Sequence, residues 1–152
     1  PDLCLRVRRA GHIVRRLDLP MTTHEADITR FAQWWRRAER WGHGYTEMLV
    51  DHGRRADARW VRAAASCVAW ALVLPVVALA CAAPTDGWSL VLLAAYAVPW
   101  ARAYRSRRPR RTRADAALYA GACLLGKWAE LHGALICLGN RLSSRRRTAL
   151  FE

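Results

Sequence analysis

Tryptophan and arginine are interleaved along residues 29–45, which read TRFAQWWRRAERWGHGY. The stretch holds three tryptophans and four arginines between Thr29 and Trp41. A guanidinium group binds phosphate oxygens through two parallel hydrogen bonds, and an indole offers a large apolar face with one polar N–H group. At helical spacing, these two residue types suit a helix on a membrane surface, a nucleic-acid groove or the edge of a sugar-binding site.

The composition of the whole chain narrows these interpretations. Its 152 residues are enough for one domain, and the net charge of +13 favours an anionic partner. However, 53% of the residues are hydrophobic and eight are tryptophan, which is unusually apolar for a nucleic-acid-binding tail. The five cysteines contain no C-x-x-C pair, so we expect buried free thiols rather than a zinc site or a disulfide framework.

An uncharged run of 21 residues, AAASCVAWALVLPVVALACAA at 63–83, is long enough to cross a bilayer core of about 30 Å. Pro75 predicts a kink within it. A turn at 84–87 separates it from a shorter apolar run at 88–101. We therefore predict a transmembrane hairpin over 63–103, with spans at 63–83 and 86–103. Arginines flank both outer sides and the turn carries only Asp86, so the positive-inside rule places both chain ends in the cytoplasm.

Residues 104–152 are predicted to follow the hairpin on the cytoplasmic side. They begin with the basic loop SRRPRRTR at 106–113 and end with the basic tail RLSSRRRTALFE. Between these, residues 114–142 carry a row of leucines that is interrupted by Lys127, Glu130 and His132. Because charges inside a membrane span are costly, we expect an amphipathic or re-entrant helix there rather than a third span.

Residues 1–24 have the pattern of a soluble domain. The first eleven residues predict a helix that ends at Gly11, and HIVRRLDL at 12–19 predicts a strand. A helix followed by a strand suits the last unit of an α/β domain, and about twenty residues cannot bury a core by themselves. We therefore expect residues 1–24 to be the C-terminal remnant of a catalytic domain whose remainder lies upstream of Pro1.

Residues 25–62 are predicted to form an interfacial amphipathic helix followed by a basic linker. The apolar positions keep helical spacing in two adjacent rows: Ile28, Phe31, Trp35, Ala38, Tyr45 and Leu49 in one, and Trp34, Trp41 and Met48 in the other. A tryptophan-rich amphipathic helix shortly before a membrane span is expected in the plane of the interface. The neighbouring span therefore favours a membrane surface over a nucleic-acid groove. The fold class is mostly α, with the end of an α/β domain at its start.

The order of these features resembles the end of a membrane-bound family 2 glycosyltransferase, an inverting enzyme with a GT-A fold. The resemblance rests on P-x-L-C-x-R-x-R-x-x-G at 1–11, on MTTHEADITRFAQWWRR at 21–37, on the apolar pair and on a closing segment. The closing segment consists of Gly126, Lys127, Glu130, Gly133, Asn140, Arg141, Leu142, Arg145 and Arg146. The resemblance covers nearly the whole chain, and RFAQWWRR is its most specific part.

The resemblance implies roles for five residues of the tryptophan-arginine stretch. Gln33, Trp34, Trp35 and Arg36 correspond to the Q-x-x-R part of the family's Q-x-x-R-W motif. There, the arginine neutralises the nucleotide diphosphate leaving group and an aromatic residue stacks on the acceptor sugar. Arg37 stands where the family has tryptophan, so the stacking face is left open between the neighbouring tryptophans.

The resemblance also implies partners and cofactors. His24 falls where an imidazole binds a metal or a phosphate, or holds loop backbone groups. The expected partners are a nucleotide-sugar donor, a lipid-linked or polysaccharide acceptor and membrane lipids, with no nucleic acid, in the bacterial inner membrane. The expected ion is Mg²⁺ or Mn²⁺, but its ligands are not in this chain, which contains no D-x-D motif.

The acidic pair that holds the general base is expected upstream of Pro1, so we expect this fragment alone to be inactive. The alternative interpretation is a small non-enzymatic membrane anchor or assembly protein, which is favoured by the lack of a complete catalytic set.

Overall fold

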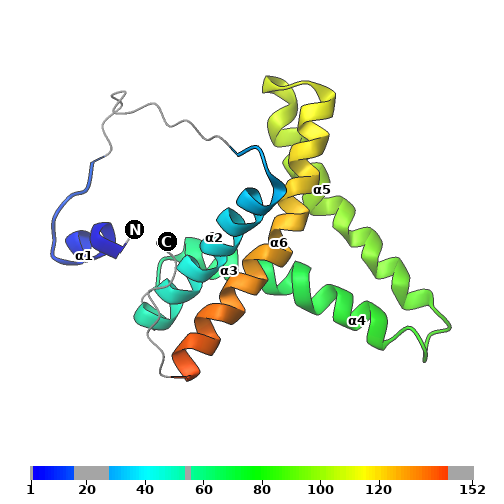
Figure 1. Ribbon diagram of the computed structural model, residues 1–152, viewed down its shortest axis with the longest axis horizontal. Helices are drawn as coiled ribbons and strands as arrows, with labels where there is room; N and C mark the ends of the chain where they lie inside the picture. Colours follow the sequence, from blue (N-terminus) through cyan, green and yellow to red (C-terminus); the bar gives the residue numbers. More distant parts are fainter. Residues whose placement is uncertain (1, 16–27, 54–55, 144–152) are drawn as a thin grey trace.

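The computed structural model describes residues 2–15, 28–53 and 56–143, which are mostly helical and contain no strand. The helices are α1 (Asp2–Arg9), α2 (Phe31–His52), α3 (Ala58–Val68), the π-helical turn η2 (Ala69–Val73), α4 (Leu74–Ala80), the 3-10 helix η3 (Trp88–Tyr96), α5 (Ala97–Arg107), the 3-10 turn η4 (Arg108–Arg110) and α6 (Arg113–Leu142). Figure 1 shows α2 lying along α6, while α4 and the segment returning from it form an arm that projects away from both.

Helices α3, η2 and α4 follow one another without a break, and the widened turn between them has a physical cause. Pro75 has no backbone N–H, and its ring crowds the carbonyl of the residue four positions earlier. The π-helical turn Ala69–Val73 lies immediately before α4, in which Pro75 occupies the first turn. A π-helical turn shifts the hydrogen-bond pattern by one residue. The structure thus has a π-helical turn immediately before the segment where the sequence predicted a kink.

The continuous helix Ala58–Ala80 is the one helix of the described residues that is long and apolar enough to cross a membrane, judged by length and composition. Only 17% of its most apolar stretch is buried inside the protein. Large apolar side chains such as those of Leu72, Val76 and Leu79 are exposed. The predicted first span, 63–83, overlaps this helix except for its last three residues, which belong to the following turn.

The chain reverses at residues 81–87 and returns along the same helix. Asp86 and Gly87 have positive φ angles of 48° and 84°, which glycine adopts without strain and aspartate tolerates. The Ser89 hydroxyl donates a hydrogen bond to the carbonyl of Ala78 at 2.6 Å, and the Tyr96 hydroxyl donates one to the carbonyl of Trp70. The returning segment is therefore antiparallel to the first.

The predicted second span, 86–103, differs from a regular α-helix. Trp88–Tyr96 is a 3-10 helix, and α-helical geometry begins at Ala97. A 3-10 helix rises about 2.0 Å per residue, so its nine residues cover about 18 Å where an α-helix would cover about 14 Å. The tighter winding lengthens a short apolar run. By length and composition, this segment does not qualify as a membrane-crossing helix, so that criterion supports only the first of the two predicted spans.

The helix predicted at 114–142 is present as α6, whose 30 residues span about 45 Å. At its start, the Thr112 hydroxyl accepts a hydrogen bond from the backbone N–H of Asp115 at 3.1 Å. The polar residues that argued against a third span have partners. Lys127 and Glu130 form an ion pair at 2.8 Å, and the His132 ring lies 3.5 Å from the Glu39 carboxylate of α2.

Helices α2 and α6 run parallel and touch backbone to backbone at two glycines. A Cβ atom on Gly42 would lie 1.9 Å from the carbonyl oxygen of Glu130, and one on Gly133 would lie 1.9 Å from that of Glu39. No side chain fits at such distances, so both positions require glycine. The buried residues around this crossing include Tyr45, Met48, Cys67, Ala129 and Cys137.

At the N-terminal end, the predicted helix is present as α1, and Gly11 has φ +84°, the left-handed conformation expected after a helix end. The strand predicted at 12–19 is not found in its described part, because residues 12–15 are irregular. A strand is stable only when neighbouring strands pair with it, and the described residues offer none. The rest of that segment, and His24 with it, lies outside the described residues.

Candidate functional site

Gln33 closes the first turn of α2. Its side-chain oxygen accepts hydrogen bonds from the backbone N–H groups of Thr29 at 3.1 Å and Arg30 at 3.0 Å. These donors would otherwise lack partners, because the first N–H groups of a helix have none within it. The structure therefore gives Gln33 a capping role at the start of the tryptophan-arginine helix.

Trp34 and Trp35 belong to an aromatic cluster with Phe31. Ring centroids lie 5.3 Å apart for Phe31 and Trp34, 5.9 Å for Phe31 and Trp35, and 6.4 Å for the two tryptophans. Trp34 also faces α6, where its ring would lie 3.8 Å from a Cβ atom on Gly126. Both indoles are half-buried, so each keeps part of its surface exposed while its position is held by neighbours.

Arg36 and Arg37 are both exposed but lie on different sides of α2, because successive helical residues are rotated by about 100°. The carbonyl of Arg36 accepts a hydrogen bond from the Arg40 guanidinium at 3.3 Å. Arg37 lies one turn before Trp41 and shares its face. The five predicted residues thus divide into a cap, an aromatic cluster and two separate arginines.

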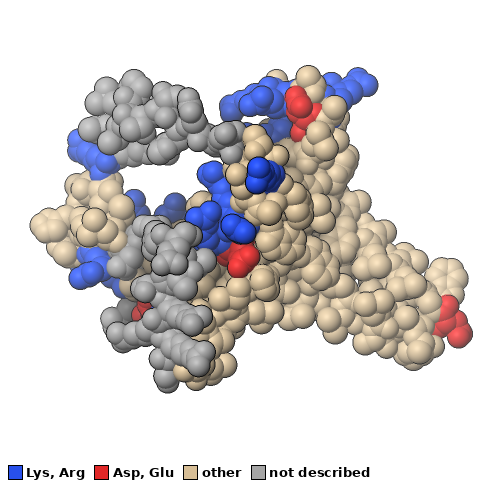
Figure 2. All heavy atoms as spheres, in the orientation of Figure 1, with Lys and Arg blue, Asp and Glu red and all other residues tan. Residues whose placement is uncertain are grey.

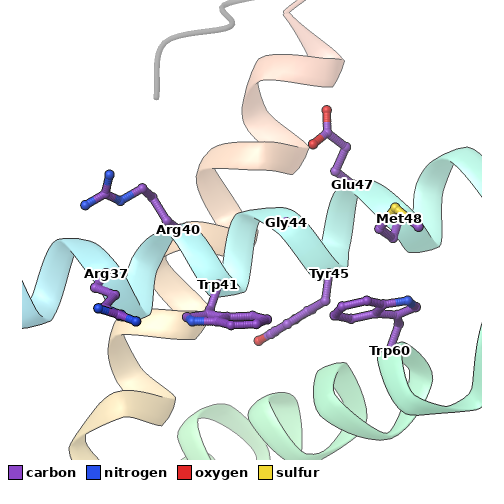
Figure 3. Close-up of a pocket in the computed structure, with 8 residues that line it drawn as sticks. All are labelled: Arg37, Arg40, Trp41, Gly44, Tyr45, Glu47, Met48 and Trp60. Atoms are coloured by element: carbon purple, nitrogen blue, oxygen red, sulfur yellow. The ribbon is translucent and has the colours of Figure 1, made fainter. Parts of the chain in front are cut away.

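A groove of about 400 Å³ lies between α2 and α3, and we call it the α2–α3 groove. Its lining consists of Arg37, Arg40, Trp41, Gly44, Tyr45, Glu47, Met48 and Trp60. Figure 3 shows Arg37, Trp41, Tyr45 and Trp60 in a row on the side of α2 that faces α3, whereas Arg40 and Glu47 point to the other side.

Sequence reasoning missed Trp60 as a site residue. The helical spacing of Arg37, Trp41 and Tyr45 was visible in the sequence, but nothing local indicated that Trp60 would fold back beside them.

A buried polar cluster lies beneath the groove where α2, α3 and α6 meet. Tyr45 is only 3% exposed, and its hydroxyl has no hydrogen-bond partner among the described residues. Burial, and after it the nearby Cys67 thiol and Glu130 carboxylate, raises the pKa of Tyr45. The Cys67 thiol itself donates to the carbonyl of Lys127 at 3.3 Å. Tyr45 is therefore neutral. Its buried ring lines the groove in a fixed position and does not act as an acid or base.

The entry into α3 is held by Asp57. Its carboxylate accepts a hydrogen bond from the backbone N–H of Arg59 at 2.9 Å and pairs with the Arg59 guanidinium at 2.9 Å. The side-chain hydrogen bond from Arg59 is the main reason that the pKa of Asp57 is lowered to about 2. This cap sets the start of α3, and so the position of Trp60 in its first turn.

Within the described residues, no group of three or more histidine, cysteine, aspartate or glutamate side chains could hold a metal ion. Binding of Mg²⁺ or Mn²⁺ therefore stays a prediction about residues outside this set. Comparison with known protein families, curated proteins and solved structures finds no match to this chain.

Proposed function

We propose that this chain is the membrane-anchored C-terminal part of a glycosyltransferase that transfers a sugar from a nucleotide-sugar donor to a lipid-linked or polysaccharide acceptor with inversion. The observation that carries the proposal is the position of α2. The helix with QWWRR packs against the start of the apolar helix Ala58–Ala80, so its exposed arginines would sit at a bilayer surface.

The charge distribution supports the membrane part of this proposal. In Figure 2, no Lys or Arg is visible on the surface of the projecting arm, and the acidic atoms of the arm appear only at its tip. The basic side chains lie over the upper, central and left parts of the molecule instead. The turn at the tip carries Asp86 and no arginine. Cytoplasmic segments are enriched in arginine and lysine, so this pattern supports an arm that enters the membrane from the cytoplasmic side as a two-helix hairpin.

Arg36 suits the chemistry proposed for it. In an inverting transfer, an acceptor hydroxyl attacks the anomeric carbon, a general base takes the hydroxyl proton, and the nucleoside diphosphate leaves with the bonding electron pair. An exposed guanidinium can neutralise the charge that develops on the diphosphate through two parallel hydrogen bonds. The base, and the ligands of a Mg²⁺ or Mn²⁺ ion, are expected in residues that precede Pro1.

The half-buried tryptophans support an acceptor role for the same end of α2. Trp34 and Trp35 are held by Phe31 and keep part of each indole exposed beside Arg36. A rigid, partly exposed indole offers apolar area to a sugar ring at little cost in side-chain entropy.

The test uses the full gene product in isolated membranes, with release of nucleoside diphosphate measured for a panel of nucleotide sugars. We expect Arg36→Ala to lower turnover by a factor of about a hundred, as for loss of one transition-state hydrogen-bond donor. Arg105→Ala, which removes an exposed arginine of α5, is the control and should retain activity. Carbonate-resistant membrane association should be unchanged in both variants.

Equal activity of Arg36→Ala and the wild type would contradict the leaving-group role. A gene whose upstream region lacks both a D-x-D motif and an acidic pair would instead favour the non-enzymatic membrane anchor. The largely exposed apolar arm fits that alternative equally well.

A further inference from the structure

The α2–α3 groove is strongly amphiphilic along its length. Arg37 lies at one end of the row in Figure 3, followed by Trp41, Tyr45 and Trp60. Met48 adds a flexible apolar side chain beside Trp60. Glu47 points away from the row, so it does not neutralise the arginine within the groove. A ligand that fits this arrangement carries one anionic group and a long apolar portion.

The Arg37 guanidinium is available for such a ligand. It is exposed, and no ion pair or hydrogen bond joins it to any residue in the described ranges. Asp57 pairs with Arg59 and Asp51 with Arg141, and Glu47 points away from the row that contains Arg37. A guanidinium without a carboxylate partner is suited to bind phosphate through two parallel hydrogen bonds.

The apolar part of the groove is preformed. Trp41 is 57% exposed although it sits beside the fully buried Tyr45, so a large indole face stays open. Tyr45 is fixed by the three-helix junction, and Trp60 is fixed by the Asp57 cap at the start of α3. A volume of about 400 Å³ holds a phosphate group with part of an acyl chain but not a whole lipid. The remainder of the chain would lie in the surrounding bilayer.

We infer that the α2–α3 groove binds an anionic phospholipid, with its phosphate on Arg37 and an acyl chain along Trp41 and Trp60. A bilayer lipid is the favoured occupant because α3 continues directly into the apolar helix Ala58–Ala80. Lipid is therefore the amphiphile present at highest concentration beside the groove. Tryptophan and arginine are also the residues that anchor proteins at the level of lipid headgroups.

This inference rests on the membrane association proposed above but not on sugar transfer. Arg36 and Arg37 lie on different sides of α2, so the two can be altered separately. Loss of lipid binding would leave the leaving-group role of Arg36 intact, and an inactive enzyme would leave lipid binding measurable.

The experiment measures binding of phosphatidylglycerol and phosphatidylcholine to the detergent-purified full gene product by native mass spectrometry. We expect phosphatidylglycerol to bind more tightly, and Arg37→Gln to weaken it about tenfold, as for loss of a charge-assisted hydrogen bond. Arg62→Gln is the matched control, because it removes the same charge from an exposed arginine of α3 that is not among the residues lining the groove. It should change affinity by about twofold or less.

Two further variants separate binding from folding. Arg37→Lys keeps the charge but loses the paired hydrogen bonds, so its affinity should fall between those of the wild type and Arg37→Gln. Trp41→Ala should weaken the binding of both lipids, because it removes the apolar surface along which the acyl chain lies. Circular dichroism and membrane association report whether each variant is folded.

Three results would overturn the inference. Equal losses in Arg37→Gln and Arg62→Gln would indicate a general surface charge rather than a site. Equal affinities for the two lipids would remove the role of the anionic headgroup. Displacement of phosphatidylglycerol by inorganic phosphate alone would show a phosphate site that makes no use of the groove.

Discussion

The close contact between Gly133 and α2 allows a quantitative prediction of how much Gly133→Ala destabilises the fold. In Gly133→Ala, the new Cβ atom would lie 1.9 Å from the carbonyl oxygen of Glu39, 2.8 Å from its carbonyl carbon and 3.0 Å from the backbone nitrogen of His43. Even a close C···O contact needs about 3.3 Å, so α2 and α6 would have to separate by about 1.4 Å. The obstacle is backbone, which cannot rotate away as a side chain can.

The expected cost follows from that separation. Overpacking a core costs about 1–3 kcal/mol when side chains can adjust, and here the adjustment is a movement of two helices. A gap of about 0.5–1 Å already forfeits a quarter to a half of the dispersion energy of the atoms that line it. We therefore expect a loss of about 3 kcal/mol or more, which lowers Tm by about 6–12 °C in a protein of this size.

The assay is thermal unfolding in detergent, followed by circular dichroism, with two other glycines of α6 as matched controls. A Cβ atom on Gly139 would meet nothing within 4 Å, and one on Gly126 would meet the Trp34 ring at 3.8 Å, an ordinary contact. Gly139→Ala should raise stability by up to about 1 kcal/mol through helix propensity. If Gly133→Ala unfolds at the same temperature as Gly139→Ala, the close approach of α2 and α6 is wrong.

Two further predictions concern the groups that hold α3 and the junction. The pKa of Asp57 is lowered to about 2 from an ordinary 3.8, so its carboxylate stabilises the fold above about pH 4, and this contribution disappears as the pH falls through 2. The Tm difference between the wild type and Asp57→Ala should be present at neutral pH and absent below pH 2, and a constant difference would count against the Arg59 pairing. Tyr45→Phe should raise Tm, because a buried hydroxyl without a partner costs about 1–3 kcal/mol; a large fall in Tm would mean that the hydroxyl has a partner.

Local patterns in the sequence were sufficient for most of the helices. The apolar run at 63–83, the periodic residues of α2 and the row of leucines in α6 each contain their own signal within a few turns. A chain reversal was also predicted, at 84–87 within the observed turn 81–87, because Pro84 and Gly87 are turn residues. The strand at 12–19 was not predictable in the same way, since an extended segment becomes a strand only when another strand pairs with it.

The candidate site could also be predicted only in part, because it depends on contacts between helices that are distant in the chain. The residue types of QWWRR pointed to phosphate and to aromatic stacking, but they did not indicate that Gln33 would cap α2. They also could not show which of Arg36 and Arg37 faces a groove, because that depends on which side of α2 the neighbouring helices cover. The partner helix decides which of them faces a groove.

By itself, therefore, the sequence determined most of the helical segments, the apolar run at 63–83 that is long enough to enter a membrane, and where the positive charge lies. These properties depend on side chains close together in the chain, through hydrogen-bond capping, periodicity and transfer from water. Only the tertiary structure decided that Gly42 and Gly133 bring α2 and α6 into backbone contact, and that Trp60 folds back beside Trp41 to form a groove. Those contacts join residues distant in the chain, and they depend on how whole helix surfaces fit together rather than on any local preference.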